Sequence, residues 1–185
     1  MPPPRPSDPP ARAFTYGAVG ATRPAEEHWA PGRTGLRPYA CTVVIGHGER
    51  DWCAAADAVL RWGVKRRSGF TVTGCGGAGE RVTVGAEYRI TAGRGPFTVR
   101  EPVRVVAVVD LPDRCGFAYG TLPGHPVRGE EAFVVHRSPD DTVALTIRSL
   151  TRAAPHGPWR PLFPVLLVAQ RFFRLRYRRA LMASS

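Results

Sequence analysis

Side chains that could carry out acid–base chemistry gather in one hairpin-like stretch, residues 115–133. Tyr119 lies in its first half, and His125 stands in a Gly-His-Pro turn. Glu130 and Glu131 open the returning half. Imidazole gains and loses a proton near neutral pH, and a nearby carboxylate tunes its pKa. We therefore predict that Tyr119, His125 and Glu130 bind a ligand at the mouth of a cavity.

This stretch leaves two questions open. Successive side chains of a strand point to opposite faces, so one of Glu130 and Glu131 faces the interior, and the sequence does not say which. The Gly and Pro residues can also simply set a hairpin turn, with His125 facing solvent and a glutamate paired to Arg128. No catalytic residue is assigned. An enzyme that uses the same cluster for acid–base chemistry is an alternative to a ligand-binding protein.

Other familiar site motifs are missing from the sequence. Cys41, Cys53, Cys75 and Cys115 are far apart and lack C-x-x-C or zinc-finger spacing, so we expect no metal site and reduced thiols. The glycine-rich residues 74–79 lack the Lys-Ser/Thr of a phosphate-binding loop, and no serine lies in a nucleophile elbow. We therefore expect no cofactor.

The candidate residues need a sheet to position them. Alternation of apolar and polar residues with period two predicts about six to seven strands. They lie near residues 41–45, 70–73, 82–90, 103–109, 115–121, 131–136 and 142–150. The nearly continuous β-branched run 103–109 indicates a strand covered on both faces. An alanine-rich helix is expected over residues 50–62 with Gly63 as its C-terminal cap, and a long amphipathic helix over residues 162–182.

The order of these elements predicts an α+β fold. A curved antiparallel sheet of about six to seven strands would grip the long C-terminal helix, because an open sheet with one apolar face needs such a cover. Residues 1–12 are expected to be a disordered proline-rich tail, and residues 13–185 a single domain. Aromatic residues between positions 14 and 38 predict an irregular segment wrapped on the core. The arrangement resembles the helix-grip architecture of START and Bet v 1-like proteins, which implies a cavity between sheet and helix for a small, partly apolar ligand.

Net charge gives a less specific indication. The chain has 26 Lys and Arg against 15 Asp and Glu, a net charge of +11, which would suit nucleic acid or an anionic surface. Only Lys65 is a lysine, and the arginines are spread along the chain. A basic nucleic-acid or anionic-surface binder is therefore kept as a third hypothesis, although no nucleic-acid partner is expected. We find no apolar leader or membrane-spanning stretch, so a cytoplasmic protein is expected.

Several short blocks are distinctive as motifs. They are Tyr-Gly-Ala-Val-Gly-Ala-Thr-Arg at 16–23, Gly-x-Gly at 46–48 with Ala-Val-Leu-Arg-Trp at 58–62, Gly-Phe-Ala-Tyr-Gly-Thr-Leu-Pro-Gly-His-Pro at 116–126, and Gly-Glu-Glu-Ala-Phe at 129–133. Together they resemble the family of uncharacterised proteins called DUF1990, over about residues 14–182. The resemblance implies one domain and carries no established reaction. Val127 departs from the family pattern, which usually has an acidic residue after the proline.

Overall fold

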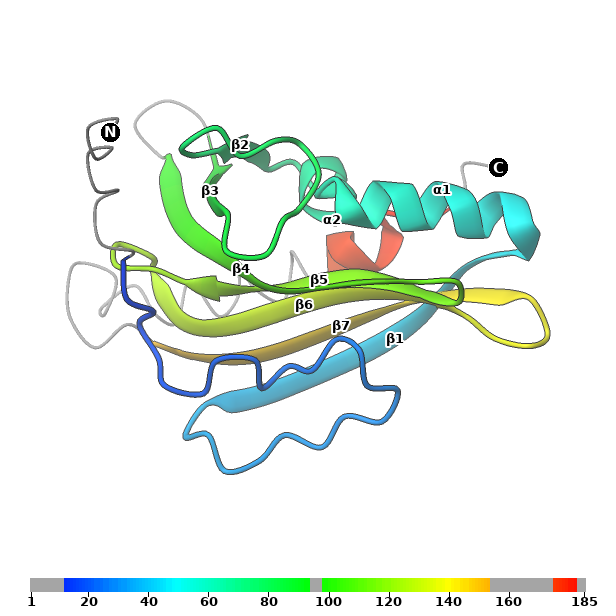
Figure 1. Ribbon diagram of the computed structural model, residues 1–185, viewed down its shortest axis with the longest axis horizontal. Coiled ribbons are helices and arrows are strands. Elements are labelled where there is room, and N and C mark those ends of the chain that lie inside the picture. Colours follow the sequence, from blue (N-terminus) through cyan, green and yellow to red (C-terminus); the bar gives the residue numbers. More distant parts are fainter. Residues whose placement is uncertain (1–11, 94–97, 154–174, 183–185) are drawn as a thin grey trace, which may run out of the picture.

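Seven antiparallel strands form one curved sheet (Figure 1). The structure is a computed structural model, and it describes residues 12–93, 98–153 and 175–182. The strand order is β1-β7-β6-β5-β4-β3-β2, so the first strand closes against the last and the others follow as a meander. The strands are β1 (Arg37–His47), β2 (Thr71–Gly74), β3 (Glu87–Ala92), β4 (Val99–Leu111), β5 (Arg114–Thr121), β6 (Val127–Arg137) and β7 (Thr142–Ala153).

Helices cover one face of this sheet, which we call the inner face. They are α1 (Gly48–Leu60) and α2 (Gly63–Arg67), and both follow directly after β1 (Figure 1). Alternation along β5 and β6 turns Phe117 and Phe133 toward this face, and both are fully buried in the core. Each large apolar side chain buried in this way stabilises the fold by about 1.5–3 kcal/mol.

The junction between the helices differs from the predicted one. Trp62 takes the left-handed conformation that was expected of Gly63, with φ of 63°. Gly63 instead begins α2, and a Cβ there would lie 2.5 Å from the carbonyl oxygen of Ala58. Glycine is thus required at position 63 because the start of α2 lies so close to the Ala58 carbonyl. Trp62 can hold the unfavourable backbone conformation because it is completely buried against Phe117 and Tyr88.

Two predicted strands also differ. The strand expected over residues 82–90 begins only at Glu87, because the Val82 amide donates to the Leu60 carbonyl and Gly85 turns the chain with φ of 81°. The strand around residues 103–109 is longer than expected, and its two faces are unequally covered. Val103 is fully buried on the inner face, whereas Arg104 on the other face forms an ion pair with Glu87.

The long C-terminal helix is not shown. Most of the predicted range, residues 162–174, lies outside the described residues, and the described part is helical only over 175–179. This short helix places Tyr177 in the core, where its ring contacts Phe133 edge-on at 5.4 Å between centroids. The antiparallel sheet of the predicted fold is confirmed.

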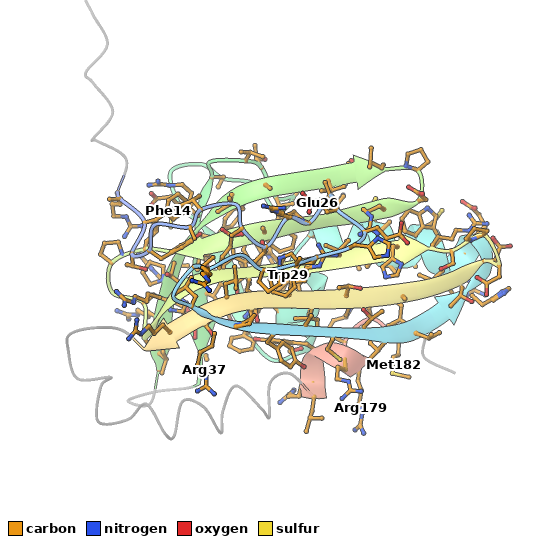
Figure 2. All side chains as sticks on the ribbon, turned by 90° about the horizontal axis from the view of Figure 1, so that it is seen from below. Phe14, Glu26, Trp29, Arg37, Arg179 and Met182 are labelled. Carbon is orange, nitrogen blue, oxygen red and sulfur yellow. The ribbon has the colours of Figure 1, made fainter. Side chains whose placement is uncertain are left out.

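The opposite, outer face of the sheet is crossed by residues 12–36, which we call the N-terminal segment. Figure 2 shows this segment running over the strands, with Phe14 and Trp29 along its path. The outer-facing glycine Gly120 permits this, since a Cβ there would lie 2.9 Å from Phe14 and 2.3 Å from the Tyr16 hydroxyl. The segment is irregular, as predicted, but it lies on the outer face of the sheet and not on the hydrophobic core of the inner face.

A buried carboxylate of β6 fastens this segment. Glu130 accepts hydrogen bonds from the Tyr16 hydroxyl at 2.8 Å, the Gly20 amide at 2.7 Å and the Thr22 amide at 2.9 Å. The Thr22 hydroxyl also donates to it. Hydrogen bonds to a charged group contribute more than neutral ones, about 1.5–3 kcal/mol each. The donors of the N-terminal segment therefore replace the water molecules that would surround the Glu130 carboxylate if it were exposed.

Arg148 of β7, whose guanidinium is buried, binds the next part of the same segment, residues 23–27. Arg148 donates to the carbonyl oxygens of Arg23 at 2.6 Å, Glu26 at 2.7 Å and Glu27 at 2.9 Å. Its guanidinium also lies 5.8 Å from the centre of the Trp29 ring. Backbone carbonyls of an irregular segment have no strand partners, and Arg148 supplies the donors they lack.

We predict that Arg148→Met lowers the free energy of unfolding by about 3 kcal/mol or more, because several buried carbonyl oxygens lose their charged donor. Arg152→Met is the matched control: Arg152 is an exposed arginine in the same strand, and its replacement should change stability by less than about 0.5 kcal/mol. Urea unfolding of both variants measures the difference. Equal stability of the two would show that the segment does not depend on Arg148.

Candidate functional site

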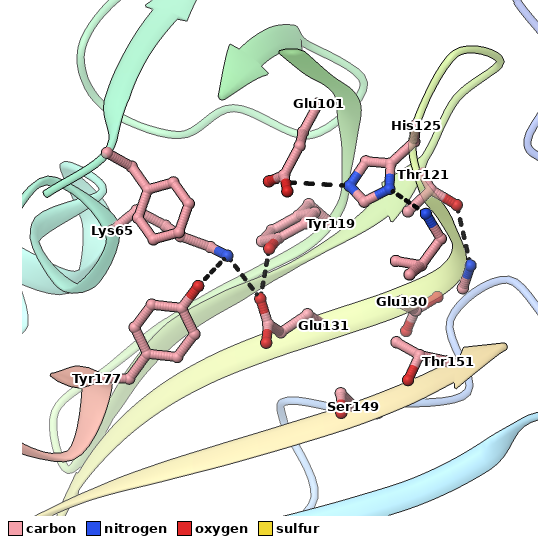
Figure 3. Close-up of a pocket in the computed structure, with 13 residues that line it drawn as sticks. Lys65, Glu101, Tyr119, Thr121, His125, Glu130, Glu131, Ser149, Thr151 and Tyr177 are labelled. Atoms are coloured by element: carbon pink, nitrogen blue, oxygen red, sulfur yellow. Dashed lines mark hydrogen bonds and ion pairs between the residues drawn. The ribbon is translucent and has the colours of Figure 1, made fainter. Parts of the chain in front are cut away.

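A pocket of about 80 Å³ opens on the inner face, between the sheet, α2 and the short C-terminal helix (Figure 3). Its walls contain the rings of Phe70, Tyr119 and Tyr177. Its other lining residues are mostly polar; they are Lys65, Glu101, Thr121, His125, Val127, Gly129, Glu130, Glu131, Ser149 and Thr151. The pocket therefore combines aromatic walls with an unusual density of charged and hydrogen-bonding groups.

Strand register sets the floor of the pocket. Tyr119 in β5 is paired with Glu131 in β6, and Glu131 with Ser149 in β7. Directly opposite residues point to the same face, and here this is the inner face that also holds Phe133. Glu131 is thus the glutamate that faces the interior, which settles the alternation that the sequence left open.

Lys65 of α2 reaches down to this floor and is almost completely buried. Its Nζ lies 2.9 Å from Glu131 Oε2 and donates to the Tyr177 hydroxyl at 2.6 Å. The ammonium also lies 4.6–5.7 Å from the centres of four aromatic rings, close enough for attraction to their faces. These rings belong to Phe70, Tyr119, Phe133 and Tyr177.

The charges in this cluster stabilise one another. Burial alone would lower the pKa of Lys65, but the Glu131 carboxylate raises it well above its ordinary value. The Tyr119 hydroxyl donates to Glu131 Oε2, and burial followed by the Glu131 charge raises the pKa of Tyr119 well above its usual range. Lys65 is therefore a fixed cation and Tyr119 a neutral hydroxyl at neutral pH. A charged ammonium is not a nucleophile.

His125 occupies the turn between β5 and β6 and points into the pocket (Figure 3). Its Nδ1 accepts a hydrogen bond from the Val127 amide at 3.1 Å. Burial, reinforced by the charge of Lys65, lowers the pKa of His125 to about 3. The imidazole is therefore neutral at physiological pH, and because Nδ1 is the acceptor, its proton sits on Nε2. His125 thus offers a hydrogen-bond donor to the pocket.

Glu101 of β4 faces that donor. Its Oε2 lies 4.0 Å from His125 Nε2, too far for a direct hydrogen bond. Burial raises the pKa of Glu101; the Lys65 charge opposes this rise and the Glu131 charge adds to it. Within the described residues, His125 is the one ionisable group that comes within 4.0 Å of this carboxylate. Glu101 is thus a largely buried carboxyl group without a close donor.

The structure places all three residues predicted from sequence around the pocket, but the carboxylate of Glu130 is turned toward the N-terminal segment. Tyr119 and His125 both line the pocket. Glu130 borders it, but its carboxylate oxygens accept their hydrogen bonds from the N-terminal segment on the outer face. A ligand contact by Glu130 therefore remains a prediction, and Glu131 is the glutamate whose carboxylate joins the Lys65 cluster.

Sequence reasoning missed Lys65, Glu101 and Tyr177. Tyr177 lay in a helix pattern that ranks it with apolar core residues, and Glu101 lay two residues before the expected strand 103–109. Lys65 carried a signal, since it is the single lysine in a chain that otherwise uses arginine for positive charge. A single lysine among many arginines indicates a position where arginine cannot take the place of lysine.

The described residues include no group of three or more His, Cys, Asp or Glu side chains placed to hold a metal ion. No helix in the described part of the chain has the length and apolar character needed to cross a membrane.

The low pKa of His125 gives a pH test. Unfolding restores an ordinary value of 6.5, so between about pH 6.5 and pH 3 the unfolded chain binds a proton that the folded protein does not. Stability is therefore lost as pH falls through this window. His125→Asn keeps an acceptor for the Val127 amide and removes the titration, so the free energy of unfolding should fall less on acidification in the variant. Thermal melts at pH 7.5 and 4.5 measure this, and parallel losses in both proteins would contradict it.

Removing the buried cation should expose the coupling within the cluster. Lys65→Met leaves Glu131 buried without its counter-ion and should lower the free energy of unfolding by about 3–5 kcal/mol. In the double variant Lys65→Met, Glu131→Gln, part of that loss should be regained, because no charge is then stranded. Arg61→Met removes an exposed ion pair with Asp57 and should change stability by less than about 1 kcal/mol. Simple addition of the single effects would show that the two groups act independently.

Solved structures with similar folds were found among proteins of low sequence identity. A hypothetical protein from Helicobacter pylori aligns with a TM-score of 0.62 at 10% identity, covering 83% of this chain and 90% of its own. Ara h 8.0201 aligns with a TM-score of 0.50 at 12% identity, covering 80% of this chain and 99% of its own. These likenesses show the fold alone, a curved antiparallel sheet with few helices.

Sequence comparison identifies the family. The curated UPF0548 protein of Deinococcus radiodurans is 35% identical over 173 residues, which are 87% of this chain and 86% of that protein. The model of the domain of unknown function DUF1990 matches residues 15–180. The resemblance seen in the sequence motifs is confirmed, and the chain belongs to the DUF1990 family.

Proposed function

We propose that this protein binds a small molecule in the inner-face pocket, with Glu101 and His125 as the groups that bind its polar end. The observation that carries this proposal is the Glu101 carboxyl. It is largely buried, its Oε2 lies 4.0 Å from His125 Nε2, and it has no hydrogen-bond donor among the described residues. A buried polar group without a partner is costly, and a ligand that supplies the donor removes that penalty.

The separation of the two groups suggests what lies between them. An oxygen placed between His125 Nε2 and Glu101 Oε2 can be about 2.8 Å from each, accepting from the imidazole and donating to the carboxylate. A hydroxyl group has both capacities in one atom. We therefore infer that the bound molecule presents a hydroxyl or a similar donor–acceptor group at this point.

Pocket size limits the part of the molecule that enters. Drug-sized ligands occupy pockets of about 300–1,000 Å³, whereas this pocket measures about 80 Å³. Only a few non-hydrogen atoms fit within such a space. The rings of Phe70 and Tyr119 offer them apolar contact, which agrees with the partly apolar ligand expected from sequence.

An acid–base enzyme is the second candidate, and the same pair of residues favours it. A hydroxyl between a neutral imidazole and a carboxyl of raised pKa could pass its proton to Glu101 while it accepts a hydrogen bond from His125. Binding without turnover and binding with turnover need the same contacts. Following the probe by NMR over time separates them, because turnover changes its spectrum. The third hypothesis, a nucleic-acid binder, draws only on the net charge of +11.

We predict that small hydroxylated probes bind this pocket more tightly than their deoxy analogues. Methanol and ethanol should shift the backbone amide signals of His125 and Glu101 in ¹⁵N NMR titrations at lower concentrations than ethane does. His125→Asn and Glu101→Leu should each weaken binding of the hydroxylated probe by about tenfold, because each removes one hydrogen bond to the hydroxyl.

The exposed carboxylate Glu80 supplies the matched control. Glu80→Gln removes one negative charge outside the pocket and should leave probe binding unchanged. Equal binding of hydroxylated and deoxy probes, or variants that are silent in every titration, would overturn the proposal.

A further inference from the structure

A second hollow lies on the outer face, on the far side of the sheet from the pocket that holds Lys65. Its volume is about 230 Å³, larger than that of the inner-face pocket. It is formed between the N-terminal segment and four adjacent strands, β5, β6, β7 and β1. Figure 2 views this face and shows the segment around Trp29 above these strands. We call it the outer-face pocket.

Strand register brings its polar groups together. Arg114 in β5 is paired directly with His136 in β6. Thr146 in β7 is paired with Thr42 in β1, and their hydroxyl oxygens are 2.8 Å apart. The Thr146 hydroxyl also lies 3.0 Å from His136 Nε2. A chain of hydrogen-bonding groups therefore crosses three strands and ends beside Arg114.

The pocket holds an excess of positive charge. Arg148 has its donors occupied by backbone carbonyls, so its charge is not neutralised by any carboxylate. Within the described ranges, the side chain of Arg114 forms no ion pair or hydrogen bond, although it lines the pocket. Glu27 is the one carboxylate among the described lining residues. Two guanidinium groups thus share this site with a single carboxylate.

The pKa of His136 reflects the same excess of positive charge. Burial lowers the pKa of its imidazole, and the charges of Arg114 and Arg148 lower it further, while Glu27 opposes them. These are the charged groups that face His136, and Thr146 is its hydrogen-bond partner. An anion bound here would reverse the balance and favour the protonated ring, which could then donate from both nitrogens.

We propose that the outer-face pocket binds a phosphate group, held by Arg114, His136 and the Thr146–Thr42 hydroxyls. Guanidinium binds phosphate oxygens through two parallel N–H donors, and hydroxyls and imidazolium supply further donors. Arg114 and Arg148 outweigh Glu27 by one positive charge, and a proton taken up by His136 adds a second, so the site matches a phosphate dianion better than a monovalent carboxylate. The volume exceeds that of the phosphate group alone, and the Trp29 ring lines the remaining space. The group can therefore belong to inorganic phosphate or to an organic phosphate monoester.

The test titrates the whole chain with inorganic phosphate, phenyl phosphate and acetate at constant ionic strength, and follows the His136 ring and Trp29 indole signals by NMR. Phosphate should bind saturably and raise the pKa of His136, and acetate should bind at least about tenfold more weakly. Tighter binding of phenyl phosphate than of inorganic phosphate identifies the monoester as the better fit, and the reverse order identifies the free ion.

Variants separate a built site from general attraction to a basic protein. Arg114→Met should weaken phosphate binding by about tenfold or more. Arg114→Lys keeps the positive charge but loses the two parallel N–H donors, so its affinity for phosphate should lie between those of Arg114→Met and the wild type. Arg89→Met removes one exposed positive charge from β3 of the same sheet and should leave binding within about twofold. Melts of each variant confirm that it is folded.

Three results would overturn the proposal. They are no saturable shift at His136 up to about 50 mM phosphate, equal weakening by Arg114→Met and Arg89→Met, and equal binding of acetate and phosphate. His125→Asn in the inner-face pocket should leave phosphate binding unchanged. The two proposals can thus fail separately.

Discussion

Two adjacent glutamates in β6 connect the sheet to the layers on both of its faces. Because side chains alternate along a strand, Glu130 points to the outer face and Glu131 to the inner face. Removing a carboxylate from water has a penalty of several kcal/mol unless charged or hydrogen-bonded partners replace the water. Each glutamate therefore requires a specific cover. The N-terminal segment supplies it for Glu130, and Lys65 of α2 supplies it for Glu131.

This requirement explains why an irregular segment can behave as part of the fold. Residues 12–36 have few backbone partners in the sheet, yet their amides and carbonyls meet Glu130 and Arg148. A carboxylate satisfies amide donors and a guanidinium satisfies carbonyl acceptors, so the two charges together replace a neighbouring strand. The small outer-facing residue Gly120 then allows the chain to lie close.

Much of this architecture could be predicted from local patterns. Period-two alternation located the strands of the meander. The limits of β3 could not be found in this way, because its first expected residues are diverted by a tertiary hydrogen bond from Val82 to Leu60. Alternation also showed that one glutamate faces inward. Which of the two glutamates faces inward depends on the register between β5 and β6, which pairs Tyr119 with Glu131. The local sequence does not contain this long-range information.

Lys65 was missed for a related reason, since a short helix after a buried tryptophan gives no period from which to assign a face. Its chemistry still explains why lysine is used there. Two of its three ammonium donors meet Glu131 and Tyr177, and aromatic rings surround the rest. Arginine would bring five donors in a rigid plane into the same space, and several would have no acceptor. A compact cation is the one that this aromatic enclosure can hold. The Lys65–Glu131 pair therefore fixes the floor of the pocket and leaves Glu101 and His125 facing each other on its wall.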